Sequence, residues 1–258
     1  MSLANTSGAN KLPALTALFW LMKICATTLG ETAGDLLSMT MDVGYAVSTL
    51  ILLGFFAITL AGQIAARKHH PALYWLVILS TSTAGTTMSD FMDRTLGLGY
   101  ATGSCILAGL LLTIFLGWKW SGVSFSVAEI RSRRAEAIYW TAILVSNTLG
   151  TALGDFLADD SGLGFAGGAI LIGVLLALIL AAYYFSSISR VLLFWLAFVL
   201  TRPFGATMGD VLTKPIEKGG LNLGTIGSSA VLGGLLLVFV AYSTLRPRDT
   251  ANNVAASA

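Results

Sequence analysis

The sequence predicts an all-α polytopic membrane protein with eight transmembrane helices, arranged as four parallel two-helix repeats. Of its 258 residues, 55% are hydrophobic and only 11% are charged. This composition is too apolar for a soluble domain and suits helices that each place roughly 20 residues in a bilayer. Eight apolar runs are present, each too long for a barrel strand. A motif that recurs four times along the chain indicates repeated structural units.

The recurring motif joins two small residues to an aspartate. Its copies are Gly30–Asp35, Gly85–Asp90, Gly150–Asp155 and Gly205–Asp210. The aspartates are 55, 65 and 55 residues apart, so the copies form two halves. An aromatic residue followed by a tryptophan precedes every copy in the same register, and these tryptophans are Trp20, Trp75, Trp140 and Trp195.

The apolar runs define the elements in chain order. They predict helices at about 13–35, 44–66, 72–90, 99–118, 137–155, 163–185, 191–210 and 224–245. The corresponding segments are an N-terminal tail at 1–12, repeat 1 at 13–66, repeat 2 at 67–118, a basic cytoplasmic link at 119–136, repeat 3 at 137–185, repeat 4 at 186–245 and a disordered tail at 246–258. The first run is longer than a signal-peptide core, so we expect it to be retained as a span.

The basic residues predict the orientation. Ten of the fifteen Lys and Arg lie in the tails or between repeats, namely Lys11, Arg67, Lys68, Lys119, Arg131, Arg133, Arg134, Arg190, Arg246 and Arg248. The turns inside repeats hold only Arg94, Lys214 and Lys218. The positive-inside rule therefore places both termini in the cytoplasm. A two-span repeat cannot invert between copies, so the repeats should be related by pseudo-rotational symmetry about the membrane normal.

A polar stripe leads inward from each aspartate, because residues four apart share one face of a helix. The stripes contain Asp35, Glu31, Thr27 and Lys23 in copy 1; Asp90, Thr86 and Ser82 in copy 2; Asp155, Thr151 and Asn147 in copy 3; and Asp210 and Arg202 in copy 4. Polar side chains facing lipid are costly, so we expect these stripes to face protein or a water-filled cavity and to form a pathway for an ion or substrate.

The small residues of the motif predict close helix packing. The pairs are Gly30 with Gly34, Gly85 with Ser89, Gly150 with Gly154, and Gly205 with Gly209. Small residues spaced by four positions let helix backbones approach closely in membranes. Such packing suits a narrow pathway, and it also suits any tight bundle.

The carboxylates are the candidate metal ligands. Together with hydroxyl and amide oxygens, they form a hard-ligand set suited to Mn²⁺, Mg²⁺ or Ca²⁺. The predicted ligands are Glu31, Asp35, Asp90, Asp155 and Asp210. Crowded carboxylates also bind protons more readily, which would permit exchange of protons for metal. In the alternative interpretation, the aspartates lie near the outer interface and are solvated or complete a turn.

Two basic residues lie inside predicted spans, and each is present in only one of the four copies. Lys23 and Arg202 should either form ion pairs between repeats or take part directly in substrate or proton handling. The four tryptophans lie near the predicted cytoplasmic boundary, where an aromatic belt at the membrane interface is the usual interpretation.

Four tandem two-span units with one in-register tryptophan each resemble a bacterial family described as four copies of a membrane repeat of unknown function. The family consists of uncharacterised membrane-anchored proteins, which implies a multi-pass protein of the cytoplasmic (inner) membrane. The resemblance covers about residues 13–245. A weaker likeness is to manganese and calcium exporters with a Glu-x-Gly-Asp motif. Copy 1 has one residue too many between Glu31 and Gly34, and Leu36 replaces the expected basic residue.

The leading functional hypothesis is a transporter or channel-like permease for a small cation, most simply a divalent metal exchanged for protons. A second hypothesis is proton-coupled transport of a small anionic metabolite bound by Lys23 and Arg202. A third is a membrane scaffold or sensor that transports nothing. We expect no enzymatic activity, no cofactor and no nucleic-acid partner, because catalytic motifs are missing and the net charge is only +2. The expected partners are the lipid bilayer and a small solute, and a homo-oligomer remains an open alternative.

Overall fold

The computed structural model describes residues 15–66, 70–121 and 133–245. Within these ranges the chain forms eight α-helices and no strand. They are α1 (Ala17–Asp35), α2 (Tyr45–Ala65), α3 (Pro71–Asp90), α4 (Tyr100–Trp120), α5 (Arg133–Asp155), α6 (Gly164–Phe185), α7 (Arg190–Thr213) and α8 (Thr225–Leu245). Both predicted tails, much of the predicted basic link, and the basic residues Lys11, Arg67, Lys68, Arg131, Arg246 and Arg248 lie outside the described residues.

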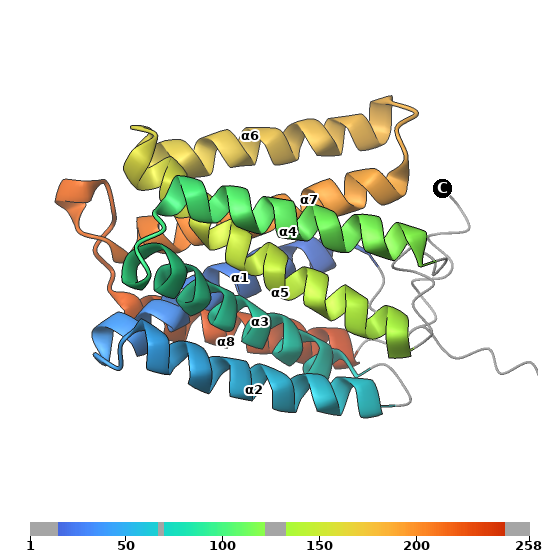
Figure 1. The fold of residues 1–258 in the computed structure, drawn as a ribbon, viewed down its shortest axis with the longest axis horizontal. Coiled ribbons are helices and arrows are strands. Elements are labelled where there is room, and N and C mark those ends of the chain that lie inside the picture. Colours follow the sequence, from blue (N-terminus) through green and yellow to red (C-terminus); the bar gives the residue numbers. More distant parts are fainter. Residues whose placement is uncertain (1–14, 67–69, 122–132, 246–258) are drawn as a thin grey trace, which may run out of the picture.

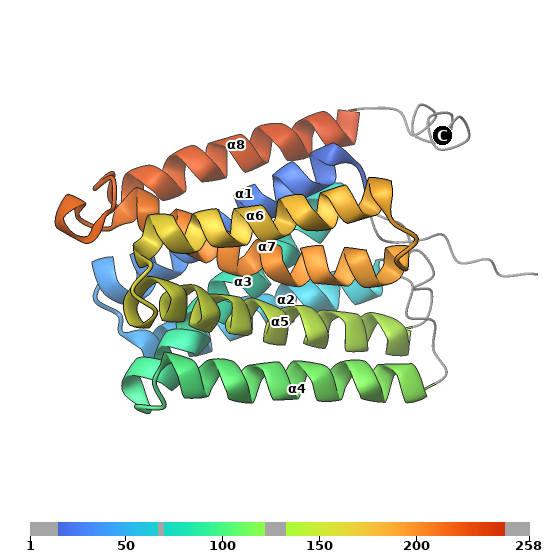
Figure 2. The same cartoon turned by 90° about the horizontal axis from the view of Figure 1, so that it is seen from above.

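The helices run side by side along the long axis of the molecule (Figure 1). The turns inside the repeats gather at one end, which also holds the motif aspartates and is called the motif end. The connections between repeats gather at the opposite end, called the link end, as the view from above also shows (Figure 2). Exposed basic residues of the link end include Lys119, Arg133, Arg134 and Arg190.

The odd-numbered helices form a closed inner ring. α1 packs against α3 and α7, and α5 packs against the same two helices. Each even-numbered helix packs on the outside against the odd-numbered helix of the following repeat: α2 on α3, α4 on α5, α6 on α7, and α8 back on α1. The main partner of each outer helix is therefore the inner helix of the following repeat, although α7 and α8 of repeat 4 also touch.

Five helices are long and apolar enough to cross a membrane by length and composition, namely α2, α4, α6, α7 and α8. The remaining helices α1, α3 and α5 carry the predicted polar stripes, which lower their hydropathy, and most of their residues are buried inside the bundle. The apolar surface of the outer helices is extensive. Leu50, Ile58, Leu178 and Val231, for example, are each at least 60% exposed, as a lipid-facing surface requires.

Several predicted boundaries differ from the structure. α4 continues to Trp120, beyond the predicted end at 118, and α5 already includes Arg133, before the predicted start at 137. After α1, α3 and α5 the chain continues for five residues as a π-helical turn: η1 (Leu36–Thr40), η2 (Phe91–Thr95) and η4 (Phe156–Asp160). In each turn a backbone N–H bonds to the carbonyl five residues earlier. In copy 4, α7 instead continues to Thr213 and is followed by the 3₁₀ turn η5 (Ile216–Lys218).

Candidate functional site: a buried ionic column inside the helix ring

The stripe residues of the four inner helices meet in a buried column. At the position four residues inward of the aspartates lie Glu31, Thr86, Thr151 and Ala206, and at the position eight residues inward lie Thr27, Ser82, Asn147 and Arg202. All eight are at most 3% exposed. Asn147 Nδ2 donates to Thr81 Oγ1 over 2.8 Å, and Thr27 Oγ1 donates to the carbonyl of Thr201 over 3.2 Å. The stripes therefore face protein, on the inner side of the helix ring.

The motif glycines lie at the contacts between neighbouring inner helices. A Cβ atom on Gly34 would lie 2.8 Å from Thr86 Cβ, and one on Gly209 would lie 2.8 Å from Glu31 Cβ. A Cβ on Gly85 would lie 2.9 Å from the backbone of Asn147, and one on Gly150 would overlap Arg202. Each glycine therefore leaves room for a stripe residue of the next repeat. Gly30, Gly154 and Gly205 make the same kind of approach to Ser82, Ala206 and Thr27, whereas Ser89 donates a hydrogen bond to Asp93 over 3.2 Å.

Arg202 connects all four inner helices. Its Nη1 lies 3.0 Å from Glu31 Oε2 and 3.3 Å from the carbonyl of Thr27, both on α1. Its Nη2 donates to Thr86 Oγ1 over 2.5 Å and to the carbonyl of Ser82 over 3.2 Å on α3, and to Thr151 Oγ1 over 2.7 Å on α5. A planar guanidinium can direct several hydrogen bonds at once, which suits this junction.

Glu31 is the acceptor at the centre of this network. Its Oε2 also accepts hydrogen bonds from Thr86 Oγ1 over 3.2 Å and Thr151 Oγ1 over 3.1 Å. Arg202 is 0% exposed and Glu31 is 3% exposed, so this is a buried ion pair with charge-assisted hydrogen bonds. A charged residue inside a span needs a counter-ion, and for Arg202 this counter-ion is Glu31 of repeat 1.

The motif aspartates form two bridged pairs at the motif end. Lys214 Nζ lies 2.8 Å from Asp35 Oδ2 and 3.1 Å from Asp210 Oδ1. Arg94 Nε lies 2.9 Å from Asp90 Oδ1, and its Nη2 lies 3.3 Å from Asp155 Oδ2. The alternative in which the aspartates are solvated is therefore wrong, because all four are buried and each contacts a cation.

The two bridging cations differ in their surroundings. Arg94 lies over the rings of Tyr45 and Tyr100, 5.8 and 5.6 Å from the centroids, and donates to the Tyr45 hydroxyl over 3.3 Å. The ammonium of Lys214 contacts the two carboxylates, and Lys214 follows α7 in an extended conformation. Burial alone would lower the pKa of Lys214, but attraction by Asp210 and Asp35 outweighs it and raises the pKa above its ordinary value. Lys214 thus stays charged at neutral pH.

Three carboxylates approach closely enough to hold a metal ion. One oxygen each from Glu31, Asp35 and Asp210 lie within 4.8 Å of one another, and all three residues are buried. Carboxylate oxygens are the ligands that Mn²⁺, Mg²⁺ and Ca²⁺ accept. The ammonium of Lys214 lies between two of them, so a metal ion bound there would have to displace it. The other two predicted ligands, Asp90 and Asp155, belong to the separate pair bridged by Arg94.

Lys23 lies deeper in the column and apart from the carboxylates. It is 0% exposed, and its Nζ has no hydrogen-bond partner within the part of the chain that the structure describes. The Nζ lies 4.1 Å from the centroid of the Phe198 ring. Ile78 and Ile143 occupy the corresponding positions on α3 and α5 and are also fully buried. Of the ion pairs between repeats expected for Lys23 and Arg202, the described residues therefore show one for Arg202, with Glu31, and none for Lys23.

The motif tryptophans and the aromatic residues before them close the link end of the inner ring. Each aromatic residue contacts the tryptophan of the following repeat, with centroid distances of 5.6 Å for Phe19–Trp75, 5.7 Å for Tyr74–Trp140, 6.1 Å for Tyr139–Trp195 and 5.9 Å for Phe194–Trp20. The hydroxyls of Tyr74 and Tyr139 lie 3.0 Å apart. The interfacial-belt interpretation is therefore wrong for Trp75, Trp140 and Trp195, which are buried, while Trp20 is half-buried.

Sequence reasoning missed Arg94 and Lys214 as members of the site. Both lie four residues after the motif aspartate of their own copy, so the same helical spacing that defines the stripe extends to them in the outward direction. Copies 1 and 3 have Met39 and Asp159 at this position. A basic residue at this position in every second copy indicates that one cation contacts the aspartates of two repeats.

Comparisons with known proteins agree with the repeat architecture. A family model described as Repeat of Unknown Function (DUF347) matches four successive segments of the chain, residues 18–69, 73–124, 138–189 and 193–249. No curated protein and no solved structure shows significant similarity to the chain. The matched segments cover most of the sequence and each contains one copy of the motif. The chain therefore belongs to the DUF347 family of repeat proteins.

Proposed function

We propose that the chain crosses the membrane eight times, with four repeats related by pseudo-rotation about the membrane normal and with the link end in the cytoplasm. The polar helices α1, α3 and α5 lie among apolar helices of similar length, which supports treating them as spans shielded from lipid. The basic residues of the link end support the orientation. The family resemblance favours the cytoplasmic membrane of a bacterium.

Within that arrangement, the protein is a carrier for a small cation, with a divalent metal ion as the substrate class. The observation that carries this proposal is the charge balance of the carboxylates and the cations that contact them, a group that does not include Lys23, which lies deeper in the column and contacts none of these carboxylates. Five carboxylates, those of Glu31 and the four motif aspartates, face three cations, Arg202, Arg94 and Lys214. Two negative charges are thus uncompensated among these groups. Uncompensated buried charge is costly, so the column should take up one divalent cation or two protons.

The substrate site is formed by Glu31, Asp35 and Asp210, where three carboxylate oxygens converge. Protons and a divalent cation would compete for the same two negative charges, which supports exchange of one for the other. Arg202 fills the middle of the column and the aromatic residues close its link end. These two features favour a carrier that alternates between conformations over a continuously open channel.

Binding of Mn²⁺ to the purified protein tests the site. Asp35→Asn and Asp210→Asn should each weaken binding by about tenfold or more, because each removes a charged ligand. Asp42→Asn is the matched control, since Asp42 is an exposed acidic residue that follows the π turn at the same end. Equal affinity in all four proteins, including the wild type, would exclude this site.

The second candidate function is proton-coupled transport of a small anion, and one observation favours it. The ammonium of Lys23 is fully buried without a hydrogen-bond partner among the described residues, and the Nε of Arg202 is likewise unpartnered. An anion between these groups would supply the missing partner. Lys23→Met should then abolish uptake of the acid while leaving Mn²⁺ binding intact. Loss of Mn²⁺ binding in the same variant would instead assign Lys23 to the cation pathway.

A further inference from the structure

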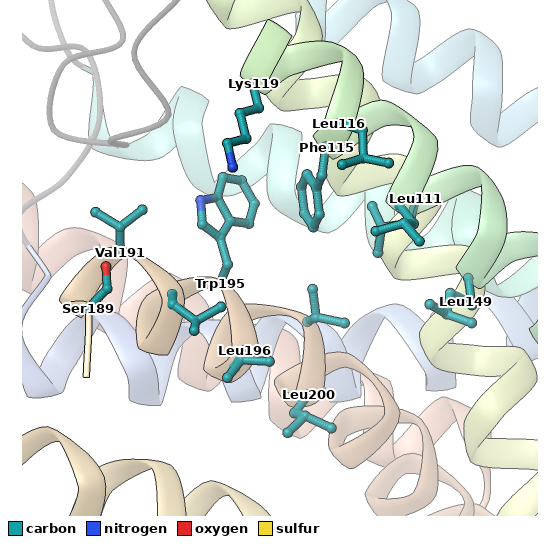
Figure 3. A pocket seen from close by; sticks show the side chains of 14 residues that line it. Leu111, Phe115, Leu116, Lys119, Leu149, Ser189, Val191, Trp195, Leu196 and Leu200 are labelled. Atoms are coloured by element: carbon teal, nitrogen blue, oxygen red, sulfur yellow. The ribbon is translucent and has the colours of Figure 1, made fainter. Parts of the chain in front are cut away.

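A groove on the outside of the bundle lies between α4 and α7, with α5 contributing Leu149 (Figure 3). Its volume is about 700 Å³. The groove follows from the way the repeats pack. α4 is held on α5 and α6 on α7, whereas α4 has no comparable helix contact with α7 in the described part of the chain. On the opposite side of the bundle, α8 also packs against α3 and fills the corresponding space.

The groove has one polar end and a long apolar remainder. Of its fourteen lining residues, only Lys119 and Ser189 are polar, and both belong to the link end. Lys119 lies in the last turn of α4 and Ser189 precedes α7. The rest of the lining is aliphatic or aromatic. A ligand that fits this surface must therefore combine an anionic head with a long hydrocarbon chain.

The length of the groove matches one leaflet of a bilayer. On α4 the lining extends from Ala108 to Lys119, a rise of eleven residue steps, or roughly 16 Å at about 1.5 Å per residue. The hydrocarbon core of a bilayer is about 30 Å thick, so one leaflet contributes about 15 Å. The apolar part thus ends near the bilayer centre when Lys119 lies at the headgroup level.

We propose that this groove binds an anionic phospholipid of the leaflet at the link end. One acyl chain lies along Leu112, Leu196 and Val199, and the ammonium of Lys119 contacts the phosphate. The proposal requires only that the helices lie in a membrane and does not depend on the transported substrate. Basic residues at the mouth of a groove between transmembrane helices are suited to anionic lipid headgroups.

Trp195 connects the groove to the aromatic residues that close the link end of the inner helix ring. Its indole lines the groove, and Figure 3 shows the Lys119 side chain extending toward it. The same ring contacts Phe115 and Trp118 of α4 at 5.0 and 5.6 Å, and Tyr139 of the aromatic closure at 6.1 Å. A lipid in the groove therefore packs against the outer face of a residue that closes the link end of the ionic column.

A second groove between α1 and α6 is a weaker match for a lipid. Its volume is about 400 Å³. On the α1 side its lining extends only over residues 15–20, which is shorter than the lining of the first groove on α4. Its one basic residue, Arg190, already donates to the carbonyl of Tyr183 and lies over that ring at 4.4 Å from the centroid. Of these two grooves, the one between α4 and α7 therefore has the cation that is available to a phosphate among the described residues.

Native mass spectrometry of the protein released from mixed vesicles tests the proposal. The vesicles contain equal amounts of phosphatidylglycerol and phosphatidylcholine with identical acyl chains. The wild type should retain phosphatidylglycerol preferentially. Lys119→Gln should lower that preference by about fivefold, because one lysine near a headgroup contributes on that scale. Leu196→Trp, which fills the groove at a half-exposed position, should release both lipids. Arg134→Gln removes an exposed charge at the same end and should change nothing.

Equal retention of the two lipids by the wild type would overturn the proposal. An equal loss of preference in Lys119→Gln and Arg134→Gln would also overturn it, because it would indicate general attraction to the link end. Retention that is unaffected by Leu196→Trp would place the bound lipid elsewhere on the protein.

Discussion

The guanidinium of Arg202 lies 3.0 Å from the carboxylate of Glu31, although the two residues belong to the fourth and first repeats. The pair closes the ring of inner helices across the ends of the chain. It also explains why these two charges can occur inside the bundle. Each is the other's counter-ion, and the hydroxyls of Thr86 and Thr151 form hydrogen bonds with both.

Removing one partner of this pair should destabilise the protein more than removing both. Arg202→Met leaves the carboxylate of Glu31 buried without its counter-ion, which should lower the free energy of unfolding by about 3–5 kcal/mol. The double variant Glu31→Gln, Arg202→Met should recover part of that loss. Unfolding in mixed detergent micelles measures the cycle, and simple additivity of the two single changes would contradict the pairing.

The glycine contacts predict that a glycine-to-alanine change lowers the melting temperature in the inner ring but not on the outer helices. Gly150→Ala places a Cβ where Arg202 lies, so the inner helices must separate and the melting temperature should fall. Gly54→Ala is the matched control, because a Cβ there meets nothing within 4 Å and α2 faces outward at this point. Thermal denaturation in detergent compares the two. A larger loss in Gly54→Ala would mean that the inner ring is not the close-packed part.

The bridge between Asp35, Lys214 and Asp210 predicts a pH dependence on the alkaline side. The pKa of Lys214 is raised above its ordinary value of 10.5. A raised pKa means that the folded state holds the proton more tightly, so the stabilisation is present below about 10.5 and is lost as the pH rises through the folded value. The difference in stability between wild type and Lys214→Met should therefore be constant from neutral pH to about 10. A difference that declines between pH 7 and 9 would contradict the bridge.

The aromatic closure predicts effects of very different size for two tryptophans. Trp140 is fully buried between Tyr74 and Tyr139, so Trp140→Ala should lower the free energy of unfolding by about 3–5 kcal/mol. Trp120 is 81% exposed at the end of α4, and Trp120→Ala should change stability by only about 0.5 kcal/mol. Chemical denaturation of both variants measures this. An equal loss of unfolding free energy in the two variants would contradict the burial of Trp140 and would favour a location at the membrane interface.

Local patterns made the repeats, the helices and the polar stripes predictable. The helical spacing of the motif places Glu31, Thr86 and Thr151 on the faces where the structure has them, because spacing along one helix needs no knowledge of its neighbours. The family resemblance was predictable for the same reason, since it rests on the register of the tryptophans and aspartates.

Contacts between repeats could not be obtained in this way. Which helix α2 packs against, and which aspartate Arg94 bridges in addition to its own, depend on how the ring closes in three dimensions. The sequence predicts the tryptophans at the membrane interface because an amphipathic ring near a helix end usually lies there. Their burial depends on the contact of each ring with the next repeat, which no single repeat encodes.

Uptake of Mn²⁺ by proteoliposomes that contain the purified protein tests the proposed carrier most directly. The wild type should transport Mn²⁺ down its gradient and move protons in the opposite direction. Asp35→Asn and Asp210→Asn should reduce the initial rate by about tenfold or more, while Asp42→Asn should leave it unchanged. Lack of uptake by correctly folded wild-type protein for Mn²⁺, Mg²⁺ and Ca²⁺ alike, or full uptake in both Asp35→Asn and Asp210→Asn, would contradict the proposal.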